Sequence, residues 1–468
     1  MNLTLPDRFK QRIRTVWDYL HTSFWFVPSL MVLSAVGLAT AGLAMDNHLK
    51  NFGRNDLPWI VYMSQPDGAR ELLSTLLASM ITMASLVFSI TMVVLTLAAS
   101  QFGPRLVRNF MDNRQTQVVL GTFVMTIIYC LLILASVSSR AADANDSSLP
   151  YATVSVAIVL VLISVCLLVL FLHILARSIM SETVIARVGH ELDDILNDLE
   201  PLQPNFQFDE PEKALPDDFK ERAAFFGSDG AGYVQSIEVE QVIKAAKEAD
   251  VLVGFYFRAG DFVVEGGRDI GVYPPERNTE KLADAIRQAI TVGTHRTPVQ
   301  DITFPIRHMV EIAVRALSPS VNDPYTATAV VDRLSVTLCR MMNKNLPSAT
   351  FKDCDGSLRM VWPRPNYASL ISAAFDQIRQ NGADKPLVVI HLIKAIGRIA
   401  DHAKIPGQVD ALKGQLNVIL NAAKREVDDP SDLSAIEKRA GAVITTLSRL
   451  NVVRSPHDLP GNDKTYTG

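Results

Sequence analysis

Side chains that could do chemistry gather first on a predicted helix over residues 300–317. Arg307, Glu311 and Arg315 are spaced four residues apart, which is typical of a surface ladder of ion pairs. His308 and Glu311 lie three apart and could share a metal ion, but a single such pair without further ligands is a weak metal signature. We interpret this cluster as structural, and we predict no metal site in the chain.

A second polar cluster follows in residues 317–329, LSPSVNDPYTATA. Asp323 and Pro324 have the types expected at the N-cap and first position of a helix. Two interpretations stay open. The segment is either a capped turn between helices, or a helix N-terminus whose free N–H groups bind a small anion or a partner. The candidate residues are Ser318, Ser320, Asn322 and Asp323.

A third cluster consists of hydroxyl side chains inside an apolar run at residues 72–100. On a helix that turns by roughly 100° per residue, eight of the nine hydroxyl residues between 74 and 100 share an arc of about 140°, and only Thr91 lies opposite. Such a face either packs against another helix or lines a water-filled path in an oligomer. The candidate residues are Thr75, Ser79, Thr82, Ser89, Thr96 and Ser100.

A basic segment follows this run. Gly103 and Pro104 predict the end of the helix, and Arg105, Arg108 and Arg114 come next. We expect this basic collar to fix the membrane orientation and to contact anionic lipid. If the hydroxyl face lines a pore, the collar would also attract anions to its inner mouth.

The remaining composition argues against several classes of protein. The sequence contains no Walker A loop, HExxH, GxSxG or Rossmann GxGxxG pattern, so we predict no enzymatic activity and no cofactor. The net charge of −4 gives no indication of nucleic-acid binding. The four cysteines lie too far apart for a zinc knuckle or a disulfide framework.

Four apolar runs without Asp, Glu, Lys or Arg predict a polytopic α-helical membrane domain over residues 25–176. The excess of Lys and Arg beside the runs predicts that both termini are cytoplasmic, with residues 1–24 as a cytoplasmic N-terminal segment. A cleaved signal peptide, cut near Ala39-Thr40-Ala41, is the alternative for the first run. The runs are 25–45, 72–100, 117–137 and 151–176.

The second half has the charge density of a globular protein and predicts a helix-dominated α+β cytoplasmic domain. A polar helix is expected to continue the fourth run as a stalk, with an apolar face that packs on another surface, such as its copy in a neighbouring subunit. A hairpin is expected with Asp355-Gly356 as its turn. Helices are expected over about 277–292, 300–317, 324–343, 366–380, 385–403, 407–427 and 431–450. The predicted parts are a stalk helix and linker at 177–230, a small β module at 231–275, a helical domain at 276–455 and a disordered tail at 456–468.

Several stretches, in order along the chain, resemble one family. SQFGPRLVRNFM and LSPSVNDPYTA are the most specific, and STLLASMITMASLVFSIT and AGDFVVEGG accompany them. The chain resembles the bacterial predicted membrane proteins grouped as domain of unknown function 2254. The resemblance implies a multi-pass protein of the bacterial inner membrane, and it implies no activity.

Together these features favour a homo-oligomeric passive channel, lined by the helix at 72–100 and controlled by the cytoplasmic domain. The alternative is a membrane-anchored sensor or scaffold whose cytoplasmic domain binds a partner or a small anion. The expected partners are the lipid bilayer and further copies of the chain.

Overall fold

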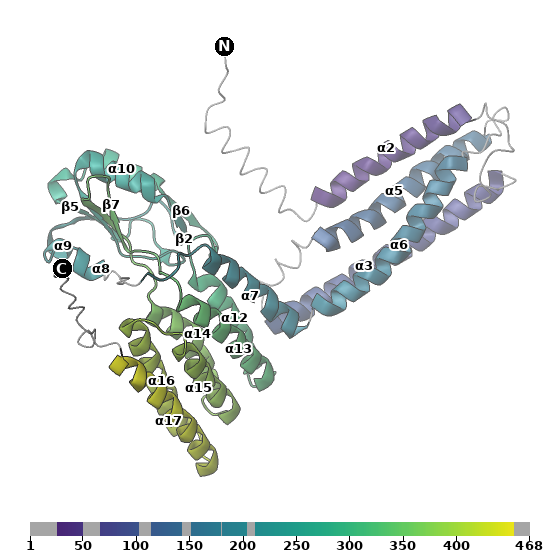
Figure 1. Ribbon diagram of the computed structural model, residues 1–468. Helices are drawn as coiled ribbons and strands as arrows, with labels where there is room; N and C mark the ends of the chain where they lie inside the picture. The colour runs from purple at the N-terminus through teal and green to yellow at the C-terminus, as the bar shows by residue number, and fades with distance from the viewer. Residues whose placement is uncertain are drawn as a thin grey trace, which may run out of the picture. The chain divides into compact units, whose positions relative to one another are not determined.

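A computed structural model describes residues 26–49, 66–102, 114–142, 151–178, 180–203 and 211–453 of the chain. The chain divides into two compact units, an N-terminal unit of Met1–Thr183 and a C-terminal unit of Val184–Gly468 (Figure 1). The predicted N-terminal segment 1–24 and the predicted tail 456–468 lie outside the described residues.

The described residues of the N-terminal unit form four long helices, and each is apolar and long enough to cross a membrane. This confirms the four predicted runs. They are α2 (Phe26–Leu49), α3 (Pro66–Phe102), α5 (Arg114–Ala142) and α6 (Tyr151–Ser178). α3 has 37 residues, or about 55 Å at 1.5 Å per residue, so it exceeds the ~30 Å hydrocarbon core of a bilayer.

The helix α5 lies at the centre of this unit, where it packs against α2, α3 and α6. One apolar cluster joins α2 to α5 around the small residues Ala35 and Ala39 and the buried ring of Tyr129. A second cluster joins α3 to α5 and α6 around Met80 and Phe123. Small side chains let two membrane helices approach closely, because packing rather than water exclusion drives their association.

A buried carboxylate ties the end of α2 to the start of α6. Asp46 accepts hydrogen bonds from the Ala152 amide at 2.8 Å, the Thr153 amide at 3.1 Å and the Thr153 hydroxyl at 3.0 Å. The Tyr129 hydroxyl donates to the Thr153 carbonyl at 3.0 Å. Asp46 therefore caps the first turn of a different helix, which satisfies amides that have no partner within α6.

The polar helix after the fourth run is a separate element, so the prediction that it continues this run is wrong. α6 ends at Ser178 and α7 begins at Ser181 (α7, Ser181–Asn197). Its apolar face is buried within its own chain. Asp193 of α7 pairs with Arg333 at 2.8 Å and with Arg340 at 2.7 Å, and both arginines belong to α13.

The described residues of the C-terminal unit form two sheets, a larger mixed one and a smaller antiparallel one. The larger has the order β1-β5-β3-β8-β7, and within it β3 and β8 run parallel, with Val253 opposite Met360. The smaller has the order β4-β2-β6. The strands are β1 (Ala224–Phe226), β2 (Gly232–Ile237), β3 (Leu252–Phe255), β4 (Phe262–Val263), β5 (Ile270–Tyr273), β6 (Ile290–Gly293), β7 (Thr350–Lys352) and β8 (Leu358–Val361).

These sheets differ from the predicted β module at 231–275. They include β1 from the predicted linker, β6 from the predicted helical domain, and the hairpin β7–β8. The hairpin has its turn at Asp355-Gly356, as predicted, and β8 pairs directly with β3. A buried strand needs neighbours on both edges, and here one of them comes from about 100 residues further along the chain.

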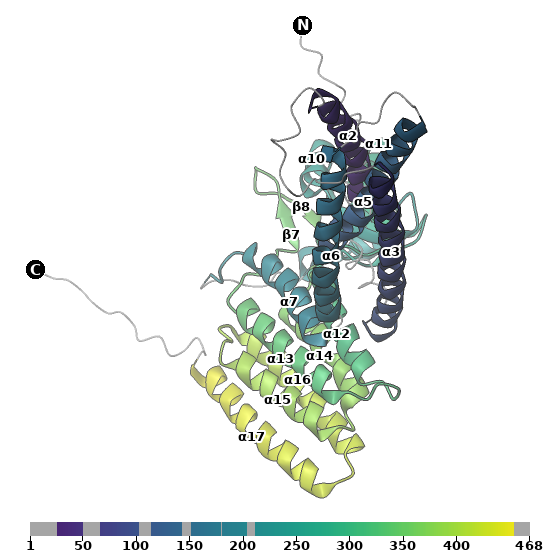
Figure 2. The same cartoon turned by 90° about the vertical axis from the view of Figure 1, so that its right-hand side faces the viewer.

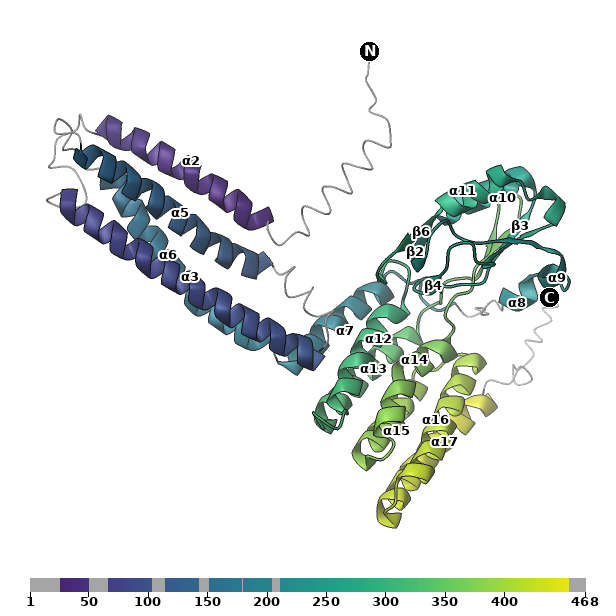
Figure 3. The same cartoon turned by 180° about the vertical axis from the view of Figure 1, so that it is seen from behind.

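Two helices cover the sheets, as Figure 3 shows for α10 (Val239–Ala249) and α11 (Glu280–Gln288). Val242 of α10 and Ile286 of α11 join Val253, Val272 and the fully buried Trp362 in one apolar core. Three short elements complete this region: α8 (Pro211–Ala214), α9 (Phe219–Arg222) and the 3-10 helix η3 (Pro275–Arg277).

Six further helices form three hairpins that stack in two layers. One layer contains α12, α14 and α16, and the other contains α13, α15 and α17 (Figure 2). Pro occupies the first position of four of them, where its fixed φ suits a helix start. Their bounds are α12 (Thr303–Ala316), α13 (Pro324–Met341), α14 (Tyr367–Gly382), α15 (Pro386–Ala400), α16 (Pro406–Glu426) and α17 (Pro430–Val453).

Candidate functional site

The hydroxyl face of α3 points away from the helix bundle. Its described candidate residues are exposed, namely Thr75, Ser79, Thr82, Ser89 and Thr96. The opposite face carries Leu73, Met80, Val87 and Val94, which are buried against α5 and α6, and the half-buried Thr91 lies on this side. Ser100 lies within α3, and its side chain is outside the described residues.

Most of these hydroxyls donate to the backbone of their own helix. Thr75 bonds the Glu71 carbonyl at 2.9 Å, Thr82 bonds the Ala78 carbonyl at 3.0 Å, and Thr96 bonds the Met92 carbonyl at 2.8 Å. The hydroxyl proton is therefore satisfied without any neighbour, and the oxygen can still accept a hydrogen bond. No other described helix of the N-terminal unit packs on this face, which leaves it open to lipid, a second chain or water.

Two residues of the predicted basic collar, Arg105 and Arg108, lie outside the described residues. Arg114 is the first residue of α5, and it is exposed.

The turn between α12 and α13 is closed by its own side chains. The Asp323 carboxylate accepts the Tyr325 and Thr326 amides, each at 3.1 Å, and the Thr326 hydroxyl at 2.6 Å. The hydrogen bond from the Thr326 hydroxyl, with the two amides, lowers the pKa of Asp323. Because a carboxylate already occupies these amides, a second anion would meet repulsion there.

The other polar residues of this turn also bond locally. The Ser318 hydroxyl donates to the Arg315 carbonyl at 2.6 Å and lies 3.3 Å from the Ser320 hydroxyl, while Asn322 adopts a left-handed φ of 49°. The geometry agrees with the interpretation as a capped interhelical turn. Val321 and Tyr325 project from it and are 52% and 75% exposed.

On α12, Arg315 pairs with Glu311 at 3.2 Å, as the spacing predicted, and Arg307 is exposed. His308 is 3% exposed, so its ring points into the core rather than toward the surface with Glu311. Among the described residues, no three His, Cys, Asp or Glu side chains are grouped as metal ligands would be.

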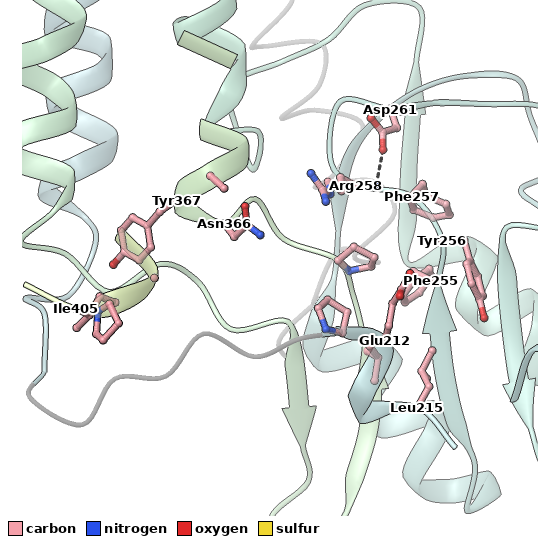
Figure 4. Close-up of a pocket in the computed structure, with 16 residues that line it drawn as sticks. Glu212, Leu215, Phe255, Tyr256, Phe257, Arg258, Asp261, Asn366, Tyr367 and Ile405 are labelled. Carbon is pink, nitrogen blue, oxygen red and sulfur yellow. Dashed lines mark hydrogen bonds between the residues drawn. The ribbon is translucent and has the colours of Figure 1, made fainter. Parts of the chain in front are cut away.

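A cleft that sequence reasoning missed lies at the carboxyl ends of the parallel strands β3 and β8. It has a volume of about 920 Å³, and it is bordered by α8, by the segment after β3, and by the starts of α14 and α16 (Figure 4). Four distant segments form it, so no local pattern in the sequence could reveal it. Among the stretches singled out in the sequence, AGDFVVEGG reaches the cleft, because its residue Asp261 is part of the lining.

Comparison with known proteins places the chain in a family. Residues 21–398 match the family model described as Predicted membrane protein (DUF2254). The chain belongs to this family. The match confirms the resemblance seen in the sequence, and it covers all four membrane helices and most of the helical stack.

Two mycobacterial proteins are similar along almost the whole chain. The uncharacterized proteins Rv1290c of Mycobacterium tuberculosis and Mb1321c of Mycobacterium bovis are each 29% identical over 453 residues, which cover 95% of this chain and 84% of the relative. No solved structure matches the chain. The DUF2254 protein described here is thus a predicted membrane protein with four apolar helices.

Proposed function

We propose that this DUF2254 protein is a homo-oligomeric passive channel of the bacterial inner membrane, lined by α3 and controlled by the C-terminal unit. One observation carries the proposal: the hydroxyl residues of α3 form the centre of an exposed face, directly opposite the face that packs on α5 and α6.

The physical argument rests on where polar groups are stable in a membrane. A hydroxyl that faces lipid gains nothing from its oxygen, whereas one that faces water accepts hydrogen bonds without adding a fixed charge. A row from Thr75 to Thr96 spans 21 residues, or about 32 Å along the helix, which matches the hydrocarbon thickness. Several copies of α3 around one axis would therefore line a neutral, wettable path.

The proposal includes an orientation with both termini in the cytoplasm. The basic residues before α2, between α3 and α5, and after α6 support it, because Lys and Arg accumulate on the cytoplasmic side. In this orientation Arg114 stands at the cytoplasmic start of α5. We propose no enzymatic activity and no binding of nucleic acid.

Conductance of purified protein in planar bilayers tests the channel. Thr96→Leu and Ser89→Leu should reduce conductance, since leucine removes the oxygen and narrows the path. Thr40→Leu is the matched control, because Thr40 is also exposed and also bonds its own helix, but lies on α2. Wild-type protein that conducts nothing across ions, voltage and membrane tension would refute the proposal, and so would an equal effect of the control.

A second candidate function is ligand sensing by a membrane-anchored C-terminal unit. The cleft beside β3 and β8 favours it, because its volume of about 920 Å³ falls in the range of small-molecule sites. Under this function, Ser89→Ala and Thr96→Ala would change the stability of an oligomer without any effect on transport.

A further inference from the structure

The cleft lies where two connections of the larger sheet diverge. β3 and β8 are parallel neighbours, so the carboxyl ends of both strands lie at the same end of the sheet. The chain after β3 turns toward β4 of the smaller sheet, whereas the chain after β8 leads to α14 in the helical stack. Parallel strands whose connections separate in this way leave a crevice at their carboxyl ends, and ligands of α/β proteins bind in such crevices.

Hydrogen bonds fix the walls of this cleft. The Trp362 indole N–H donates to the Phe257 carbonyl at 3.1 Å, which ties the two diverging connections together. On the helical side, the buried Tyr367 hydroxyl donates to the Lys344 carbonyl at 2.7 Å. The cleft is therefore formed in advance, and a ligand would not have to order its walls.

Arg258 projects between these two walls (Figure 4). Its main-chain amide donates to the Asp261 carboxylate at 2.8 Å, so the turn that carries it is fixed while its side chain is exposed. Within the described part of the chain, the Arg258 guanidinium has no ion pair. An exposed guanidinium without an ion pair to another described residue can bind a phosphate or carboxylate group through two parallel hydrogen bonds.

A second cation, Arg364, lies in the other connection, after β8, and it has no ion pair with any described residue. Arg364 follows Pro363, which lines the cleft, and its guanidinium lies 3.4 Å from the centre of the Trp362 ring. Its Nε is buried and makes no hydrogen bond to any described residue. Desolvation by burial lowers the pKa of Arg364 to about 10. Arg364 therefore adds a cation next to the lining residue Pro363, while the charged residues on the lining itself are Arg258, Glu212 and Asp261.

The remaining lining residues can contact a ligand that has both polar and apolar parts. Asn366 uses its side-chain oxygen to cap α14, through the Ser369 amide at 2.8 Å, and its NH₂ group is left as a donor. Glu212 is exposed at the opposite wall, where its carboxylate can accept from hydroxyl or amino groups. Leu215 and Ile405 supply apolar surface.

We propose that this cleft binds a phosphate ester of about mononucleotide size, with the phosphate on Arg258 and Asn366 and the hydroxyl-bearing body toward Glu212. The inference rests on the second candidate function, ligand binding by the C-terminal unit, and is independent of the channel. The mixed lining fits this class, since a phosphate ester has one anionic end and several donors at the other.

Calorimetric titration of the full-length protein in detergent tests the inference with three probes: adenosine 5′-monophosphate, adenosine and inorganic phosphate. The monophosphate should bind at least about tenfold more tightly than either fragment, because only it contacts both ends of the cleft. Arg258→Gln should weaken its binding by about tenfold or more. Arg425→Gln is the control, because Arg425 is an exposed arginine at the far end of α16, and it should change nothing.

Asn366→Asp provides a variant that keeps the fold, since aspartate is as good an N-cap as asparagine. It places a carboxylate where the phosphate would lie, so it should abolish binding while the melting temperature stays the same. Equal binding of adenosine and the monophosphate, or wild-type affinity in Arg258→Gln, would overturn the ligand class and leave ligand binding intact. No binding of any probe at about 1 mM would overturn both.

Discussion

Gly189 allows α7 to lie directly on α13, and its replacement by alanine tests how the C-terminal unit holds this helix. A Cβ at position 189 would stand 2.1 Å from Nε and 2.6 Å from Cζ of Arg333. The Arg333 guanidinium donates to the Gly189 carbonyl and pairs with Asp193 at 2.8 Å. Gly189→Ala must therefore displace Arg333 and break this pair.

The size of the effect follows from two opposing contributions. Alanine is about 1 kcal/mol better than glycine inside a helix, which favours the variant. Arg333 and Asp193 are only 18% and 22% exposed, and breaking a largely buried pair costs about 3 kcal/mol. Arg340 still pairs with Asp193, so the carboxylate keeps one partner. We expect a net loss of about 2 kcal/mol, or roughly 4–8 °C in the melting temperature of a unit this size.

Thermal unfolding of the purified protein, followed by circular dichroism, measures this change. Gly414→Ala on α16 is the matched control, because a Cβ there meets no atom within 4 Å. The control should become more stable by up to about 1 kcal/mol. The reasoning is refuted if Gly189→Ala is as stable as the wild type, since the contact with Arg333 would then be unnecessary.

Three further predictions concern ties between distant segments. Asp46→Ala removes the acceptor of three hydrogen bonds from α6. It should lower the free energy of unfolding in SDS titrations by about 2 kcal/mol, and an unchanged unfolding midpoint would exclude the role of Asp46 as a helix cap. The hydrogen bond from Arg359 lowers the pKa of Asp353 below its ordinary value of 3.8. The interaction between these two side chains therefore stabilises the fold at neutral pH, and this stabilisation is lost as the pH falls below that value. The difference in urea midpoint between wild type and Asp353→Asn should therefore shrink on acidification from about pH 6 to about pH 3, and a constant difference would contradict this. Trp362→Phe removes the hydrogen bond to the Phe257 carbonyl and should cost about 1 kcal/mol in urea unfolding; a shift no larger than that of Val418→Ala, on an exposed side chain, would argue against it.

Local patterns were enough to locate most helices. The predicted helix 324–343 is α13 at Pro324–Met341, and the predicted 407–427 is α16 at Pro406–Glu426. Apolar periodicity and proline at the first helical position act within one turn, so sequence reasoning can find them. The predicted helix 277–292 was too long: α11 ends at Gln288, and Ile290 begins β6, because pairing with β2 prevails over helical propensity.

The sequence by itself determined which parts of this protein are apolar enough for a membrane, and that the hydroxyls of α3 share one face. Both properties depend only on side-chain types and the helical period. Only the tertiary structure decided that this face points away from α5 and α6, that α7 packs on α13, and that β8 joins β3 to open a cleft beside Arg258. These features depend on contacts between residues up to about 140 positions apart, and no local pattern in a single sequence specifies such contacts.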